Sequence, residues 1–291
     1  MRESTGDRIF YAINYALLTL AALTCLFPLL NVLALSLSDP SAVMAGQVTV
    51  FPIRVQWDSY EQLIKGTNVV KAFQNSLVIA VVGTLLCMLF TVLAAYPLSK
   101  RYFLGRRTLT LAIVFTMVFS GGLIPTYLVI KSIGLVNSYG ALWLPALVSA
   151  YNMLILKTFF EGLPEELIEA SRMDGCGELR LLTRIVLPLS GPVLATLTLF
   201  YGVGFWNSFM NVLIYINDSH KINLTVMVQQ MISSQMLEDT ITLRKDEMEQ
   251  LTTPEGLKAA AIMILIIPML VVYPFIQKYF VKGVMIGSIK G

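Results

Sequence analysis

The stretch EASRMDGCGELRLLTRIVLP (169–188) is charged, contains two glycines, and lies between two long apolar runs. The chain around it is poor in charge: 56% of its 291 residues are hydrophobic and 13% are charged. Soluble domains carry about 25% charged residues, so this chain belongs to the membrane class. The stretch is therefore a polar segment held between two membrane spans.

Six uncharged runs are long enough to cross the hydrocarbon of a bilayer as helices, which need about 20 apolar residues each. The sequence predicts an all-α membrane protein with six transmembrane helices in a single domain, residues 1–291. The first run is longer than the apolar part of a signal peptide, so we expect it to be a retained helix. The predicted spans are 9–38, 72–99, 108–130, 132–156, 189–217 and 257–279. They are joined and followed by a polar loop at 161–188, an external loop at 218–256 and a tail at 280–291.

The basic residues predict the orientation, because cytoplasmic segments carry an excess of Lys and Arg. With the N-terminus inside, thirteen of the 21 basic residues fall in inside segments, which are the shorter ones. The strongest local signal is KRYFLGRR (100–107), which has four basic residues and no acidic one. We expect both termini and the loop 161–188 to be cytoplasmic.

Several kinds of site are missing from the sequence. The uncharged runs themselves cover 9–38, 72–99, 108–130, 132–156, 185–217 and 259–277, and none contains Asp, Glu, Lys, Arg or His. Proton-driven and voltage-driven proteins usually carry such groups in the membrane. There is no G-x-x-x-x-G-K-[ST] loop for ATP. Cys25, Cys87, Cys176 and the lone His220 have no metal-binding or catalytic spacing. We expect no enzymatic activity, no metal and no cofactor bound by this chain, and an energy source on a partner. A sodium-coupled secondary transporter, a channel or a structural scaffold remains an alternative.

The polar loop is predicted to form two helices joined by a tight turn. Pro164 is favourable in a first helical turn, and Glu165 and Glu166 follow it where the helix dipole favours negative charge. Gly175 is placed to end the first helix in a left-handed cap. The second helix is ELRLLTRIVL (178–187).

The first of these helices has two faces at helical spacing. One face is apolar and the other is charged: Leu163, Leu167 and Ala170 against Glu165, Glu169 and Arg172. The residues alone allow two interpretations, an amphipathic hairpin resting on the membrane surface or a rigid knob that docks into a cytoplasmic protein.

The spacing in this loop resembles the EAA loop of ABC-importer permeases. The family pattern is Glu-Ala-Ala-x3-Gly-x9-Ile-x-Leu-Pro, and the chain matches it with Glu169, Ala170, Ser171 in place of the second alanine, Gly175, Ile185, Leu187 and Pro188. The segments NMLILKTFFEGLPEELIEASRMDG (152–175) and QKYFVKGVMIGSIKG (277–291) resemble the carbohydrate-uptake branch, whose members are MalG-like and include polysaccharide and oligosaccharide permeases of Gram-positive bacteria. The resemblance covers nearly the whole chain.

That resemblance implies a MalG-like permease fold and a division of labour. The loop would be the coupling helix that sits in a groove of a nucleotide-binding subunit, with ATP and magnesium bound by that subunit and no cofactor on this chain. The residues implied in coupling are Glu169, Ala170, Ser171, Arg172, Asp174, Gly175, Ile185, Leu187 and Pro188. Glu169 and Arg172 are expected to form charge-assisted hydrogen bonds across that interface.

The same resemblance implies the partners and the cargo. They are a homologous permease in a heterodimer, two copies of an ATPase, an extracytoplasmic sugar-binding protein and the lipid bilayer, without nucleic acid. The substrate would be a carbohydrate, an oligosaccharide or a fragment of an acidic polysaccharide. The location would be the bacterial cytoplasmic membrane, which the chain crosses several times. The chain shows no internal repeat, which favours half of a heterodimer, although a homodimer remains open.

Further residues are candidates for contact with the sugar, with the binding protein or with the ATPase. Aromatic and amide side chains inside the predicted spans could line its pathway: Tyr151, Asn152, Trp206, Asn207 and Asn211. Hydrogen bonds between helices would explain the same residues. The external loop 218–256, with an added-looking segment at 237–256, and the C-terminal SIKG (288–291) are expected to contact the binding protein and the ATPase respectively. Gly121, Gly122 and Pro125 can kink the predicted third span.

Overall fold

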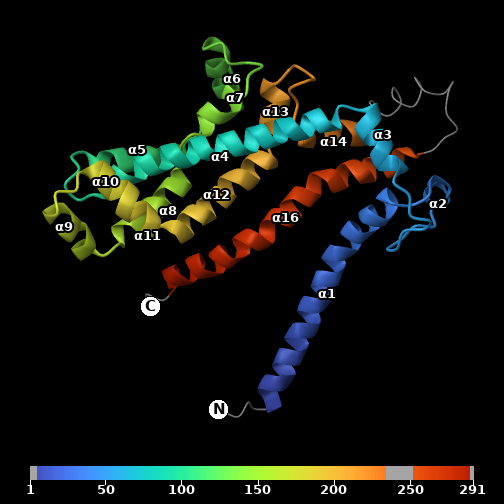
Figure 1. The fold of residues 1–291 in the computed structure, drawn as a ribbon, viewed down its shortest axis with the longest axis horizontal. Helices are drawn as coiled ribbons and strands as arrows, with labels where there is room; N and C mark the ends of the chain where they lie inside the picture. Colours follow the sequence, from blue (N-terminus) through green and yellow to red (C-terminus); the bar gives the residue numbers. More distant parts are fainter. Residues whose placement is uncertain (1–4, 234–251, 289–291) are drawn as a thin grey trace. The chain divides into compact units, whose positions relative to one another are not determined.

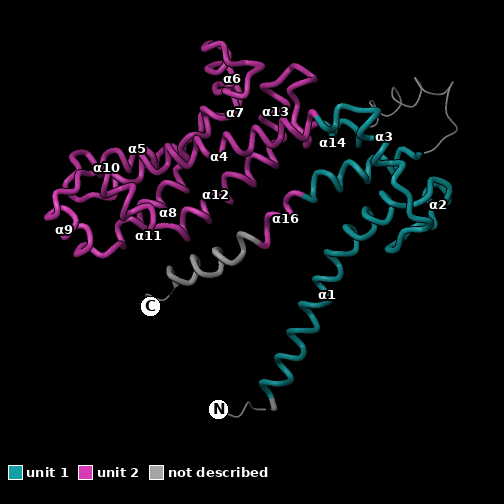
Figure 2. The backbone as a smooth tube through the Cα atoms, viewed as in Figure 1, with its two compact units in different colours: residues 1–70, 227–267 teal, residues 71–226, 268–291 magenta. Residues whose placement is uncertain are grey.

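The computed structural model describes residues 5–233 and 252–288, with side chains from 6 to 233 and from 252 to 274. All regular secondary structure in these residues is helical (Figure 1), so the predicted all-α class is confirmed. The chain divides into two units, which Figure 2 shows in separate colours: residues 1–70 with 227–267, and residues 71–226 with 268–291. The polar loop at 161–188 lies in the second unit.

The first unit is built around a long N-terminal helix. It contains α1 (Thr5–Ser36), α2 (Pro40–Met44), α3 (Asp58–Gly66), most of α14 (Leu224–Ile232) and the first turns of α16 (Pro254–Ser288). The Ser36 hydroxyl and the Tyr60 hydroxyl share a hydrogen bond of 2.9 Å, which links the end of α1 to α3. The apolar stretch of α1 has none of its side chains buried, so its surface is available to lipid or to another protein.

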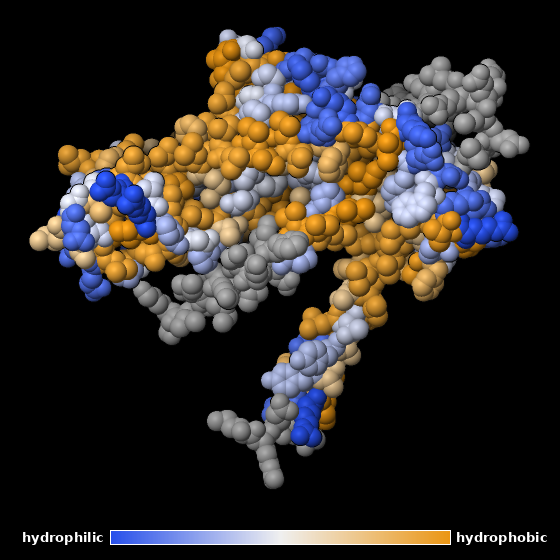
Figure 3. Space-filling model, viewed as in Figure 1, coloured by the Kyte–Doolittle hydropathy of each residue, from blue (hydrophilic) through white to orange (hydrophobic). Residues whose placement is uncertain are grey.

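The second unit holds the remaining helices. They are α4 (Val69–Ser99), α5 (Arg106–Val118), α6 (Leu123–Ser132), α7 (Gly140–Trp143), a 3-10 turn (Leu144–Ala146), α8 (Ala150–Glu161), α9 (Glu165–Met173), α10 (Glu178–Leu181), a π-helical turn (Leu182–Val186), α11 (Leu187–Leu189), α12 (Gly191–Trp206) and α13 (Met210–Tyr215). Hydrophobic residues cover α4 and α5, and polar ones gather around α9 and α10 (Figure 3). A polar region also lies around α6 and α13 (Figure 3), so the apolar surface of α4 lies between two polar regions.

Three helices of the described residues are long and apolar enough to cross a membrane alone: Gly6–Ser36, Val69–Ser99 and Pro254–Pro274. Three helix pairs pass the same test together but are bent at a short break, by 115° between α5 and α6, by 47° before α8 and by 84° before α12. The described part of the chain thus has three candidate spans, or six when each bent pair counts as one crossing.

The boundaries differ from the predicted spans where glycine and proline interrupt the helices. The predicted third span, 108–130, is two helices separated at 119–122, where Gly122 has a φ of 85°. A residue of positive φ cannot continue a right-handed helix, so the helix breaks here, whereas the sequence predicted a kink at Gly121, Gly122 and Pro125.

The later spans also start and end elsewhere. In the predicted span 132–156, residues 133–139 are not helical, and α8 continues to Glu161. In the predicted span 189–217, α12 ends at Trp206 and α13 is a separate helix. Helix α16 continues to Ser288, through most of the predicted tail. Apolar composition marks what lipid can accommodate, whereas these boundaries depend on local backbone geometry.

The core of the second unit joins the spans to the polar loop. Its buried residues include Val92, Ala95, Tyr96, Leu98, Met153, Leu156, Phe160, Ile168, Leu181, Leu182, Val186, Val193 and Leu197. They come from α4, α8, α9, α12 and the segment between α9 and α12. The loop is therefore packed against the same core as the helices on either side of it.

Candidate functional site

Helix α9 has well-defined ends. Pro164 directly precedes it in an extended conformation, and Glu165 and Glu166 occupy its first turn. After Asp174, which caps the helix, Gly175 has a φ of 78°. The backbone N–H of Cys176 donates to the Ser171 carbonyl at 3.0 Å. The predicted left-handed ending at Gly175 is confirmed.

Helix α9 buries one apolar residue and leaves other apolar residues exposed. Ile168 is 7% exposed and is the buried residue of the helix, packed into the core of the unit. The apolar side chains of Leu167 and Met173 are 47% and 88% exposed, and Ala170 between them is exposed as well. Part of the predicted apolar stripe thus faces outward, and only Leu163 of that stripe is partly buried against the core.

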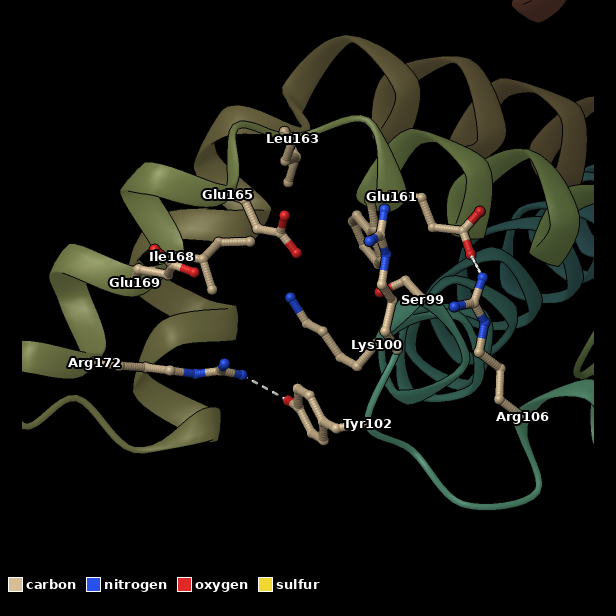
Figure 4. A pocket seen from close by; sticks show the side chains of 12 residues that line it. Ser99, Lys100, Tyr102, Arg106, Glu161, Leu163, Glu165, Ile168, Glu169 and Arg172 are labelled. Atoms are coloured by element: carbon tan, nitrogen blue, oxygen red, sulfur yellow. Dashed lines mark hydrogen bonds and ion pairs between the residues drawn. The ribbon is translucent and has the colours of Figure 1, made fainter.

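The charged face of α9 borders a cavity of about 300 Å³ (Figure 4). The cavity lies among α9, the end of α8 and the connection between α4 and α5. It is lined by Ser99, Lys100, Arg101, Tyr102, Arg106, Phe160, Glu161, Leu163, Glu165, Ile168, Glu169 and Arg172. The ammonium of Lys100 points into this space toward Glu165 (Figure 4). The three charged residues of the predicted stripe therefore line this cavity, and all three are exposed.

A carboxylate at the start of α10 connects α9 with the end of α4. Glu178 Oε1 accepts a hydrogen bond of 2.8 Å from the Arg172 guanidinium, and Glu178 Oε2 accepts one of 2.6 Å from the Tyr96 hydroxyl. Arg172 also donates to the Tyr102 hydroxyl at 2.7 Å, and its guanidinium carbon lies 4.9 Å from the centre of that ring. Arg172, which was predicted to bond across a subunit interface, is bonded within its own chain.

A second ion cluster holds the end of α8. The Glu161 carboxylate pairs with the Lys157 ammonium at 2.8 Å and with the Arg106 guanidinium at the start of α5. The three side chains are at most 30% exposed. The cluster therefore links α8 to α5 at this end of the unit.

The cavity is partly shielded from water, and two of its groups show this. Burial lowers the pKa of the Lys100 ammonium, and burial also raises the pKa of the Tyr102 hydroxyl. Lys100 lies 4.7 Å from the centre of the Tyr96 ring, a cation–π distance that offsets part of the cost of burying its charge.

The other predicted coupling residues have structural places of their own. The Ser171 hydroxyl donates to the Leu167 carbonyl at 2.6 Å, so it is satisfied inside the helix. Glu169 lines the cavity, and Ile185 and Leu187 pack against the core from the π-helical turn and α11. Pro188 is exposed in α11, just before the bend into α12.

The sequence did not identify five residues of this site: Tyr96, Lys100, Tyr102, Ile168 and Glu178. The segment KRYFLGRR was interpreted only for its positive charge, although it supplies Lys100 and Tyr102. No local spacing indicates that Arg172 meets a tyrosine 70 positions away. The one usable signal was an acidic residue directly after the Gly175 turn.

The five candidate pathway residues differ in their exposure. Asn152 and Trp206 are buried, and Trp206 packs edge-on against Phe73 with ring centres 5.8 Å apart. Tyr151, Asn207 and Asn211 are exposed. Two predicted contacts fall largely on residues that the structure does not describe. They are the contact of the segment 237–256 with the binding protein, as far as residue 251, and the contact of SIKG with the ATPase, beyond Ser288.

Metal binding finds no support in the described residues, which contain no group of three or more His, Cys, Asp or Glu side chains able to hold an ion. The described site is thus a packed helical hairpin with a charged inner face and an apolar outer face.

Comparison with known proteins decides the family. The family described as "Binding-protein-dependent transport system inner membrane component" matches residues 78–286, which include the whole polar loop. The chain belongs to this family. It is 41% identical to Protein LplC of Bacillus subtilis over 100% of its own length and 98% of that protein. It is 40% identical to the B. subtilis polygalacturonan/rhamnogalacturonan transport system permease protein YtcP, over 98% and 99% of the two chains.

A solved structure agrees with this assignment. The crystal structure of a bacterial ABC transporter involved in the import of the acidic polysaccharide alginate contains a chain of the same fold, with a TM-score of 0.89 and 30% identity over 96% of this chain and 99% of that one. The permease is therefore a non-catalytic, multi-pass subunit of a binding-protein-dependent ABC importer in the bacterial cell membrane, and it belongs to the carbohydrate-uptake branch.

Proposed function

We propose that α9 is the docking element through which an ATPase subunit drives this permease. The observation that carries the proposal is the outward apolar face of the helix, with Leu167 47% and Met173 88% exposed. In a protein that worked alone, a surface helix would turn such a face toward its own core. A partner protein that covers Leu167, Ala170 and Met173 would explain why these side chains are exposed in the isolated chain.

The assembly that follows from this proposal has four kinds of component. ATP and magnesium bind to two copies of a nucleotide-binding subunit, one of which receives α9. A homologous permease supplies the second half of the pathway, and an extracytoplasmic binding protein delivers the sugar. In this orientation both termini and α9 are cytoplasmic, in line with the positive charge of residues 100–107.

The docking proposal is tested by reversing the outer face of α9 without touching its inner one. In the double variant Leu167→Glu/Met173→Glu, two carboxylates would have to be desolvated at the interface. Burying an apolar side chain of this size contributes about 1.5–3 kcal/mol, so we expect at least a tenfold weaker association with the ATPase. Leu104→Glu is the matched control, because Leu104 is 92% exposed in the loop between α4 and α5.

The measurement is the amount of ATPase that co-purifies with the permease from co-expressing cells, together with ATP hydrolysis in lipid vesicles. Native yield and hydrolysis in the double variant would refute docking through α9. The ATPase would then have to bind the permease through another surface.

We further propose that the cargo is an oligosaccharide fragment of an acidic polysaccharide. The support is the combination of YtcP, a permease for polygalacturonan and rhamnogalacturonan, with the alginate importer as the structural relative. None of the uncharged runs of this chain carries a basic residue for a sugar carboxylate, so selectivity for charge would reside in the binding protein or in the second permease.

Exposed Tyr151, Asn207 and Asn211 are our candidates for contact with the sugar on this side of the pathway, because the second permease would face the exposed surface. Asn152 and Trp206 would support them from the interior. The test is stimulation of ATP hydrolysis by a binding protein loaded either with oligogalacturonides or with neutral arabino-oligosaccharides. Stimulation by the neutral sugar alone would overturn the proposal of an acidic cargo.

A further inference from the structure

Glu178 uses both oxygens of one carboxylate to hold two different helices. Oε1 accepts from Arg172 on α9 at 2.8 Å, and Oε2 accepts from Tyr96 near the end of α4 at 2.6 Å. Bonds between a charged donor and a charged acceptor are shorter and stronger than neutral ones. The chain of contacts Arg172–Glu178–Tyr96 is therefore a polar link from the polar loop to a membrane span.

The cavity separates most of α9 from the end of α4, and the link through Glu178 lies at its edge. Along the rest of its charged face, α9 is separated from the end of α4 by the cavity, with Glu165 and Glu169 on one side and Ser99 and Lys100 on the other (Figure 4). The polar connection lies instead at Arg172, in the last turn of α9. A displacement of α9 would therefore reach the end of α4 at one edge of the cavity, through Glu178 to Tyr96 and through Arg172 to Tyr102.

We propose that Glu178 is a positioning residue that transmits the movement of α9 to α4, so that ATP hydrolysis on the partner moves a candidate membrane span. This inference rests on the proposed docking of α9. Glu178 touches neither ATP nor sugar in this scheme. It acts by keeping Arg172 and Tyr96 at a fixed separation while the helix is pushed or pulled.

Three variants separate this role from a general structural one. Glu178→Gln keeps the shape but removes the negative charge, so the charge-assisted bonds to Arg172 and Tyr96 are replaced by weaker neutral-acceptor bonds. Tyr96→Phe removes only the bond to α4 and leaves the Arg172–Glu178 pair in place. Arg172→Met removes the bond from Glu178 to α9 and also the contact between Arg172 and Tyr102. Glu255→Gln is the matched control, an exposed acidic residue in the first turn of α16 and outside α9.

The assay uses the complete importer in proteoliposomes, with a binding protein loaded with a fluorescently labelled oligogalacturonide. ATP hydrolysis and sugar uptake are measured in the same vesicles, and thermal unfolding of each complex is recorded. We expect Glu178→Gln, Tyr96→Phe and Arg172→Met to lower the sugar imported per ATP by about 5-fold or more, the usual lower bound for a coupling interaction between sites. ATPase content and ATP hydrolysis should stay native.

The double variant Arg172→Met/Glu178→Gln should be no worse than either single one, because residues of one network do not act additively. Tyr96→Phe is the decisive variant. If Glu178 only stabilises the hairpin of α9 and α10, uptake per ATP stays native in Tyr96→Phe and the inference is overturned. A parallel loss in Tyr96→Phe and Glu178→Gln supports it.

Failure of this inference and failure of the docking proposal give different results. Native uptake per ATP in all three variants, with ATPase binding still abolished by Leu167→Glu/Met173→Glu, overturns transmission through Glu178 and leaves docking intact. Loss of the ATPase subunit from Glu178→Gln would place Glu178 in the docking surface and would also overturn transmission. If the outer-face variant keeps its ATPase, docking through α9 fails and the inference fails with it.

Discussion

Replacing Gly83 tests how closely α4 and α12 approach each other. A Cβ added at Gly83 would lie 2.8 Å from Cε2 and 2.9 Å from Cδ2 and Cζ of the Phe205 ring. Carbon atoms prefer separations of about 3.5–4.0 Å, so the two helices would have to open by roughly 0.7 Å. Phe205 is 8% exposed, and its ring therefore has little room to turn away. Overpacking of this kind costs about 1–3 kcal/mol.

Gly204→Ala is the matched control, since a Cβ at Gly204 in α12 meets nothing within 4 Å. Alanine is favoured over glycine in a helix by about 0.5–1 kcal/mol, and this gain is common to both variants. The difference between Gly83→Ala and Gly204→Ala should therefore be the steric cost alone, about 1–3 kcal/mol. In a Phe205→Leu background, where the ring atoms are gone, the penalty at Gly83 should shrink.

The assay is the free energy of unfolding of the permease in mixed micelles, titrated with a denaturing detergent and followed by circular dichroism. Equal free energies for Gly83→Ala and Gly204→Ala would refute the close approach. An unchanged penalty at Gly83 in the Phe205→Leu background would show that the ring is not its cause.

Three further variants have expected outcomes. Gly175→Ala should destabilise the fold by about 1–2 kcal/mol, because alanine is strained at a φ of 78°; the unfolding titration checks this, and a native value would contradict the left-handed cap. Asn75→Ala removes hydrogen bonds of 2.8 and 2.9 Å to the carbonyls of His220 and Ile222, and it should lower the free energy of unfolding by about 1–3 kcal/mol. Faster proteolysis of the chain after residue 217 is a second measurement. Native values in both would show that the bonds are dispensable. Burial lowers the pKa of Lys100 in the folded state, so the charged form of this side chain opposes folding. The free energy of unfolding should therefore rise as the pH increases from the folded pKa toward the unfolded value of 10.5. Unfolding titrations at a series of pH values should show a smaller rise in Lys100→Met, and an unchanged profile would contradict this.

Composition was enough to predict the class of the fold, because a chain with 13% charged residues must bury its surface in lipid. The turn at Gly175 was also predictable, since glycine is the residue that a left-handed helix ending requires. The break between α5 and α6 was not, because the run 108–130 is apolar throughout and hydropathy contains no information on backbone angle. Gly122 carried the signal, but a glycine in an apolar run fits a kink as well as a break.

The inner half of the site could not be predicted for a different reason. Arg172 and Glu178 are six positions apart across a turn, but Tyr96 and Tyr102 reach them from another helix and its following loop. Such contacts depend on how α4 packs against α10, and no spacing within either segment encodes that. The charged stripe of α9 was visible in the sequence, whereas the direction in which it points was not.

That direction links the fold to the proposed function. Amphipathic helices of isolated proteins place apolar residues inward, because exposed apolar surface is costly in water. Helix α9 buries Ile168 but turns its charged face toward a partly shielded cavity, and it leaves Leu167 and Met173 exposed. Among the charges that line the cavity, Arg172 is paired with Glu178, which stabilises its position. The outward apolar residues have no such compensation within the described part of the unit, and a protein partner would supply it. A sequence that favours the assembled state over the isolated chain is expected for a subunit that imports its cargo only when another protein moves it.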